Sequence, residues 1–195
     1  MESLPARLAQ ASPASVDGTW QRHVPAKFIA GALNGRSATG RWGTENGFPV
    51  LYLGRPTDSV TVEAYRHLID PVADAAPPIS PRALITCTVS VSTILDLRSA
   101  TNRILSNLTM QQLQSDTRDR DAYRACQNVA AVAHQLEFHG VIAPAATQMG
   151  ETLVLFTDRL PASEEPARIA EKLWTELPPD PRNPGQGRRL RVVRQ

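Results

Sequence analysis

The chain of 195 residues lacks the signatures of several common enzyme classes. It contains no GxxxxGK(S/T) phosphate loop, no GxGxxG fingerprint, no HExxH metal motif and no GxSxG nucleophile motif. Its four histidines, His23, His67, His134 and His139, have no ligand spacing that carboxylates support. These absences argue against a nucleoside triphosphatase, a triad hydrolase and a metalloenzyme, and we expect no metal site.

Cysteines and long apolar runs are scarce as well. Cys87 and Cys126 lie far apart in apolar surroundings, without CxxC or metal-type spacing, as is typical of reduced core cysteines in a cytosolic protein. No apolar run approaches the roughly 20 residues that a membrane helix needs. Residues 1–18 carry no signal-peptide pattern. We therefore expect a cytoplasmic protein that does not contact a membrane.

Length and composition favour one domain. A chain of this size buries enough surface to fold without a metal or a disulfide, and its 42% hydrophobic and 21% charged residues are ordinary for a soluble protein. We expect a loose lead-in over residues 1–18, a domain over 19–178 and a basic Pro/Gly/Arg-rich tail over 179–195. The tail could bind phosphates, but such runs are more often solvated, so we do not expect nucleic-acid binding.

The residue patterns predict a mixture of strands and helices. The clearest strand covers residues 83–93, where buried-type residues alternate with threonine and serine. Residues 27–47 are rich in glycine and are predicted as loop. The order of elements has no regular βαβ rhythm, so we predict a compact α+β domain with a small mixed or antiparallel sheet flanked by helices. Further strands are predicted over residues 20–24, 49–53, 140–144 and 152–157.

Four segments have helical patterns. The segment after the second strand carries Val60 and Ala64 on one face and is predicted to be capped by Thr57 or Asp58. Residues 99–113 give a weaker helical pattern, and residues 119–139 give a stronger one. Residues 164–177 are predicted as an amphipathic helix with a buried face formed by Ile169, Leu173, Trp174 and Leu177.

The stretch from Gly40 to Leu68 contains the residues with the most distinctive chemistry. Arg41 lies in a glycine-rich loop, and Arg22 comes from an earlier strand; two guanidinium groups suit a diphosphate because each can donate a pair of hydrogen bonds. Tyr52 offers a flat face for a heteroaromatic ring and a hydroxyl for orientation. Glu63 is a single carboxylate on a helix, which could bind a ribose hydroxyl and stabilise positive charge at an anomeric carbon.

This set fits the nicotinamide–ribose bond of NAD+. Hydrolysis of an ordinary glycoside takes two carboxylates, one of which protonates the leaving oxygen. Nicotinamide in NAD+ is already cationic and leaves as a neutral molecule, so no general acid is required. One carboxylate with diphosphate-binding arginines is then sufficient, and the rate would come from electrostatics and positioning.

Taken singly, each of these residues also has an ordinary structural role. Glu63 fits a surface helix acid with His67 as its i+4 partner, Arg41 fits a loop arginine, and Tyr52 fits a core tyrosine. The residues in isolation therefore leave the site open.

The order of motifs along most of the chain resembles the RES domain. The segments QRHVP, GRW, LYL and TVEAYRHL carry Arg22, Arg41, Tyr52 and Glu63 in the family's order, and later segments follow in sequence. This resemblance implies a fold similar to the ADP-ribosyltransferase toxins. It also implies a toxin of an Xre–RES toxin–antitoxin pair that attacks NAD and is blocked at its cleft by an Xre-type antitoxin. The later matching segments are ILDL, YRACQNVAAVA, GVIAPAA and ETLVLF.

The resemblance also implies roles for the site residues. Arg22 and Arg41 would bind the NAD phosphates, Tyr52 would position the nicotinamide end, and Glu63 would bind the ribose and stabilise the oxocarbenium ion. Two positions depart from the family pattern. Ala145 replaces the family serine, with Thr147 as a substitute hydroxyl, and Gly43 replaces an asparagine.

Three functional hypotheses follow. The favoured one is a toxin that depletes NAD+ by hydrolysis or by phosphorolysis, with water or inorganic phosphate as acceptor. The alternative is an ADP-ribosyltransferase that modifies a cellular protein. A weaker alternative is a non-catalytic binding module that uses the basic tail.

Overall fold

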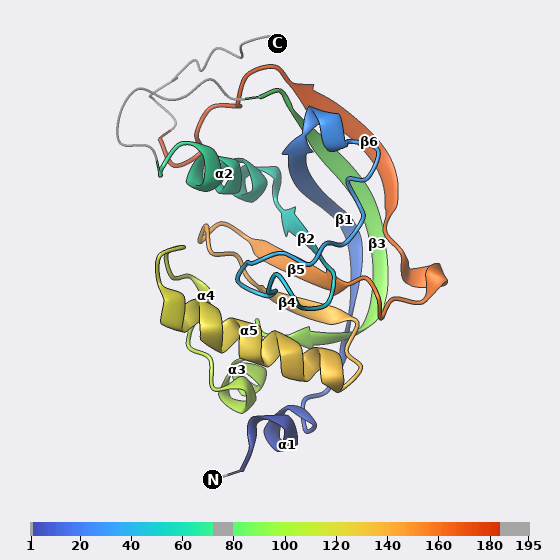
Figure 1. The fold of residues 1–195 in the computed structure, drawn as a ribbon, viewed down its shortest axis with the longest axis vertical. Coiled ribbons are helices and arrows are strands. Elements are labelled where there is room, and N and C mark those ends of the chain that lie inside the picture. The colour runs from blue at the N-terminus through green and yellow to red at the C-terminus, as the bar shows by residue number, and fades with distance from the viewer. Residues whose placement is uncertain (1, 72–79, 184–195) are drawn as a thin grey trace.

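The computed structural model describes residues 2–71 and 80–183, which form one mixed sheet flanked by helices (Figure 1). The predicted α+β class is confirmed. The strands are β1 (Ala14–Pro25), β2 (Val50–Arg55), β3 (Arg82–Asp96), β4 (Gly140–Pro144), β5 (Glu151–Phe156) and β6 (Ala167–Trp174). The helices are α1 (Leu4–Leu8), α2 (Thr57–Leu68), α3 (Ala100–Ser106), α4 (Met110–Leu113) and α5 (Arg120–Gln135), with short 3-10 turns η1 (Ala26–Phe28) and η2 (Ala162–Glu164).

The strand pairings close a ring. The long β3 pairs antiparallel with β1, and its C-terminal end pairs parallel with β4. Antiparallel pairs β4–β5 and β5–β2 continue the ring, and β2 meets β1 at the single register pair Gln21 and Gly54. β6 is added antiparallel to the first half of β3. The sheet is therefore mixed, with β3–β4 as its parallel pair.

Hydrophobic clusters hold the helices on this ring. The predicted inner face of β3 is buried, and it packs with residues of β1, β2 and β5 such as Trp20, Leu51 and Leu153. A second cluster joins α1, α3, α4 and α5 to the other faces of β2, β4 and β5. A third packs α2 against Leu84 and Trp174. In Figure 1, α2 lies in the upper half and α4 and α5 in the lower half, with β2, β4 and β5 between them.

The predicted helix over residues 164–177 is wrong. Residues 167–174 form β6, and Ile169 and Leu173 are 56% and 55% exposed instead of buried. Only Trp174 and Leu177 of the predicted face are buried. The helical spacing of these apolar residues is real, but the free edge of β3 offers a row of backbone donors and acceptors that the segment satisfies as a strand.

Other boundaries also differ from the prediction. Residues 1–18 are not a loose lead-in, because α1 is anchored by the fully buried Leu8 and β1 begins at Ala14. No side chain caps α2; the Thr57 hydroxyl lies within the helix and donates to Gln21 Oε1 (2.7 Å). α5 ends at Gln135, before Glu137 adopts a left-handed backbone with φ of 63°. No helix in the described part of the chain is long and apolar enough to cross a membrane.

Candidate active site

One cavity of about 500 Å³ brings together the four residues that the sequence singled out. Arg22 reaches it from β1, Arg41 from the loop before β2, Tyr52 from β2 and Glu63 from α2. The opposite wall comes from α4, α5 and the segment between them. Its volume lies within the range of about 300 to 1,000 Å³ that is typical of small-molecule sites.

The turn from Gly40 to Gly43 is fastened to Tyr52. The Gly40 N–H donates to the Gly43 carbonyl (3.0 Å), and the Trp42 N–H donates to the Tyr52 hydroxyl oxygen (3.0 Å). A Cβ on Gly40 would lie 2.7 Å from that hydroxyl, so only glycine permits the approach. Gln127 of α5 donates to the Gly40 carbonyl (2.8 Å). These contacts fix both Tyr52 and the start of the arginine-bearing turn; burial raises the pKa of Tyr52, which keeps its hydroxyl protonated.

Arg41 is held by protein groups. Its Nη1 donates to the Gln112 carbonyl (2.6 Å) and the Ser115 hydroxyl (3.0 Å), and its Nη2 donates to the Ser115 carbonyl (2.6 Å). The guanidinium also lies over the Tyr123 ring, 4.5 Å from its centroid. Three of its five N–H donors are therefore used by these protein groups.

Arg22 has no such partners. No hydrogen bond or ion pair to another described residue satisfies its guanidinium, and its Nε is sealed from solvent without a partner. Burial lowers its pKa, while the negative charge of Glu63 opposes that shift. A desolvated guanidinium that faces a cavity with its donors free is a ready anion-binding group.

Glu63 is the sole acid among the described residues that line the cavity. Its side chain is 40% exposed, and its Oε1 lies 3.7 Å from His67 Nε2. Burial by itself raises the pKa of this carboxyl, but the contact with His67 and the basic groups around the carboxyl outweigh it, so the pKa lies below its ordinary value. Glu63 is therefore ionised at neutral pH and cannot serve as a general acid there.

The segment that follows β4 contributes Thr147 to the cavity. Ala145 is buried with 1% exposure and is not among the residues lining the cavity. Thr147 does line it, and its Oγ1 lies 2.7 Å from the Ser59 hydroxyl. Ser59 precedes Glu63 by one turn of α2, so the hydroxyl pair and the carboxylate lie on one face of the helix.

Several cavity residues could not be found from sequence patterns. Arg66 of α2 donates to the carbonyls of Ala146 and Ser115 and so ties both facing loops to the helix. These partners are 80 and 49 positions away, so no local spacing reveals them. His23 of β1 also lines the cavity. Ser59 could have been found from its i+4 relation to Glu63.

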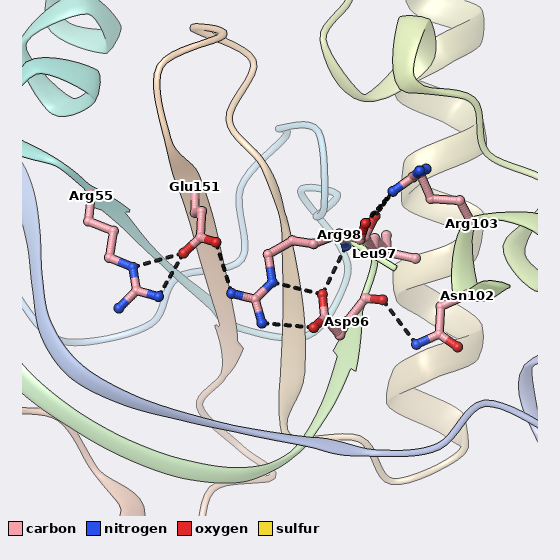
Figure 2. Close-up of polar contacts among 7 residues, drawn as sticks. All are labelled: Arg55, Asp96, Leu97, Arg98, Asn102, Arg103 and Glu151. Atoms are coloured by element: carbon pink, nitrogen blue, oxygen red, sulfur yellow. Dashed lines mark hydrogen bonds and ion pairs between the residues drawn. The ribbon is translucent and has the colours of Figure 1, made fainter. Parts of the chain in front are cut away.

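A second group of charges lies at the ends of β2, β3 and β5, outside the cavity lining (Figure 2). Arg98 donates to Asp96 Oδ1 and Oδ2 (2.9 and 2.7 Å) and to Glu151 Oε1 (2.8 Å). Glu151 Oε2 accepts from Arg55 Nε (2.8 Å) and lies 2.7 Å from Arg55 Nη2. We call these four residues the Arg98 network. Every member has a partner of opposite charge.

Within residues 2–71 and 80–183, no group of three or more His, Cys, Asp or Glu side chains could hold a metal ion.

Comparison with known proteins gives a family and related solved structures. The model of the RES domain matches residues 19–176. A chain in the crystal structure of the M. tuberculosis MbcT–MbcA toxin–antitoxin complex is similar to this one, with a TM-score of 0.73 and 25% sequence identity. The match covers 88% of this chain and 92% of that chain. A search of curated proteins gives no match.

Proposed function

The chain belongs to the RES domain family, and on that premise we propose that it is the toxin of a toxin–antitoxin pair and cleaves the nicotinamide–ribose bond of NAD+. The observation that carries this proposal is the shared cavity of Arg22, Arg41, Tyr52 and Glu63. It combines free guanidinium donors with one ionised carboxylate. That combination suits a substrate with a diphosphate and a leaving group that needs no proton.

Each residue has a role in this reaction. Arg22 binds the diphosphate with its Nη donors, and Arg41 adds a positive charge that protein groups hold in place. Tyr52 positions the nicotinamide end. Glu63 binds the ribose and stabilises the positive charge that develops at the anomeric carbon.

The bond changes balance without an added acid or metal. The C–N bond breaks with its electron pair going to the ring nitrogen, so nicotinamide leaves as a neutral molecule. The anomeric carbon becomes an oxocarbenium ion beside the Glu63 carboxylate. An oxygen of water or of inorganic phosphate then forms the new C–O bond; with water, the displaced proton goes to solvent. Because Glu63 stays ionised, its stabilising charge is available throughout the neutral pH range.

The missing family serine is compensated within the cavity. Ala145 offers no hydroxyl and does not line the space, whereas the Ser59–Thr147 pair does and lies one helical turn from Glu63. We assign the hydrogen bonds of the late motif to this pair. In the segment after β4, Thr147 rather than Ala145 is therefore the functional residue.

The test is release of nicotinamide from NAD+ by the purified chain, with and without inorganic phosphate. NAD+ labelled in its adenylate part identifies the acceptor. Free ADP-ribose indicates hydrolysis, its 1-phosphate indicates phosphorolysis, and label on a protein band indicates ADP-ribosyl transfer. Glu63→Gln is the matched inactive variant. Absence of nicotinamide release with water, phosphate and protein acceptors alike would overturn the proposal.

Two further assignments belong to the same proposal. The partner is an antitoxin of the Xre type that covers the cleft, and the site of action is the cytoplasm. Co-expression with the product of the neighbouring open reading frame tests the partner, since a cognate antitoxin would co-purify and suppress nicotinamide release. The alternative of a binding module that uses the basic tail concerns Arg188–Gln195, which lie outside the described residues; salt-dependent nucleic-acid binding lost on their deletion would favour it.

A further inference from the structure

His23 lines the cavity beside Arg22, and its ring is oriented by one strong contact. Its Nδ1 lies 2.8 Å from Arg82 Nε, which donates a hydrogen bond to it. A guanidinium carries only donors and no acceptor, so His23 Nδ1 must be the accepting nitrogen and carries no proton. The ring proton therefore resides on Nε2. This assignment follows from the donor chemistry of arginine alone.

The protonated nitrogen, His23 Nε2, has no hydrogen-bond partner among the described residues and is not sealed from solvent. Because His23 lines the cavity, we infer that this unsealed nitrogen faces it. Trp174 of β6 lies nearly parallel to the His23 ring, with 6.1 Å between centroids and an interplanar angle of 15°.

Burial and the charges around His23 keep it neutral. Burial lowers its pKa most, and the positive charge of Arg82 adds to that effect; Arg22 and His67 act in the same direction, and only Glu63 opposes them. The pKa falls to about 3. His23 consequently stays uncharged throughout the physiological pH range, although an acid lies close to it.

We propose that His23 is a substrate-binding residue that donates one uncharged hydrogen bond from Nε2 to an oxygen of the ligand next to Glu63, and that Arg82 is the positioning residue that fixes this tautomer. The identity of that ligand as NAD+ rests on the proposed function. A neutral donor orients the ribose or carboxamide oxygen without adding positive charge beside the developing oxocarbenium ion.

The tautomer can be tested without any substrate. In the full chain labelled with ¹⁵N-histidine, the His23 resonances are expected to show an unprotonated Nδ1 and a protonated Nε2 from pH 5 to 8. A His23→Leu spectrum identifies the signals. A protonated Nδ1, or a doubly protonated ring at pH 7, would overturn the inference. Because this experiment uses no NAD+, it decides about His23 even if the chain releases no nicotinamide.

The role of Arg82 is tested with a matched pair of variants. Arg82→Met removes both the donor and the charge, so the His23 pKa should rise from about 3 while burial still holds it below its ordinary value, and nicotinamide release should begin to fall at a higher pH on acidification than in the wild type. Arg82→Lys keeps a charged donor and should retain the pH profile of the wild type. Identical flat profiles and unchanged His23 resonances in both variants would contradict the positioning role.

Ligand contact is tested by the same resonances. Addition of ADP-ribose or NAD+ should shift the His23 Nε2 signal, while the His134 signal, outside the cavity, should stay in place. A His23 signal that does not move at ligand saturation would overturn the substrate contact. A shift without nicotinamide release would support His23 as a ligand contact and refute the proposed cleavage.

Discussion

Arg22 of β1 lines the cavity, whereas Arg98, directly after β3, lies outside the cavity lining. The two guanidinium groups differ in whether protein groups accept their hydrogen bonds. Arg98 donates three hydrogen bonds to two carboxylates. These contacts, of which the one with Asp96 has the largest effect, raise the pKa of Arg98 above its ordinary value. Arg22 donates none to the described residues, and burial lowers its pKa. The Arg98 network joins the ends of three strands, whereas the Arg22 guanidinium in the cavity is available to bind an anionic ligand.

The difference separates charges that stabilise the fold from charges that serve a ligand. Paired ions with good geometry recover part of the cost of leaving water, and breaking one pair leaves an uncompensated charge. An unpaired, desolvated guanidinium lowers the free energy of unfolding. Such a residue is retained only where a function, such as ligand binding, requires it. Variants in the two regions should therefore fail in opposite ways.

The largest effect is expected for Glu63→Gln. The variant removes the sole acid among the described residues that line the cavity, so nicotinamide release should fall by about 10² to 10³-fold, the usual cost of losing one electrostatic stabiliser. Its melting temperature should change little, because the carboxylate is 40% exposed and its contact with His67 is long. Kinetics and thermal unfolding of the same preparation measure both.

The matched control is Glu151→Gln in the Arg98 network. It should lower the melting temperature and leave the turnover of the folded protein within about threefold, since a neutral amide cannot satisfy two guanidinium groups. Loss of activity without loss of stability in Glu151→Gln would erase the contrast between the two regions.

Arg22→Met should give the next largest effect. Loss of charge-assisted hydrogen bonds worth about 1.5 to 3 kcal/mol should raise the KM for NAD+ roughly ten- to hundredfold. The free energy of unfolding should be equal to that of the wild type or higher, because no described protein group loses a partner. Substrate titration and urea unfolding separate the two effects; a strongly destabilised Arg22→Met would contradict the view of Arg22 as unpaired.

The contrast also explains what the sequence could and could not predict. Motif order along the chain was enough to choose Arg22, Arg41, Tyr52 and Glu63, and the structure brings all four to one cavity. It could not distinguish the free Arg22 from the engaged Arg41. That distinction depends on carbonyl groups more than 70 positions from Arg41, which no local pattern encodes.

Long-range hydrogen bonds also explain the other features that the sequence did not predict. The donor from Arg82 to His23 crosses 59 positions, and it converts an apparently ordinary histidine into an oriented neutral donor. In β6, the spacing of Ile169, Leu173 and Trp174 favoured a helix, but the unpaired edge of β3 decided the outcome. Alternation predicted β3 itself correctly, because its inner face is buried along its whole predicted length.

A smaller effect is expected from acid on the Arg98 network. Burial by itself raises the pKa of Asp96 and of Glu151, but hydrogen bonds from Arg98, and for Glu151 also from Arg55, outweigh it and lower both. A carboxyl with a depressed pKa in the folded state stabilises the fold above its ordinary pKa of about 4 and loses that contribution as the pH falls. The wild type should thus lose about 1 to 3 kcal/mol more stability between pH 5 and 2.5 than Arg98→Met. Urea unfolding across this range measures the difference; parallel curves would show that the network is not the cause.

The smallest effect is expected for His67→Gln. His67 Nε2 lies 3.7 Å from Glu63 Oε1, and the imidazole is 55% exposed, so the pair is screened by solvent. Exposed ion pairs contribute about 0.2 to 1 kcal/mol, which corresponds to less than about a fivefold change in rate. Because His67 helps to lower the Glu63 pKa, the variant should also move the acid limb of nicotinamide release to higher pH. A pH profile of initial rates checks both; a hundredfold loss would mean that His67 contacts the reacting atoms, and the cavity would then depend on two residues of α2 rather than on Glu63 alone.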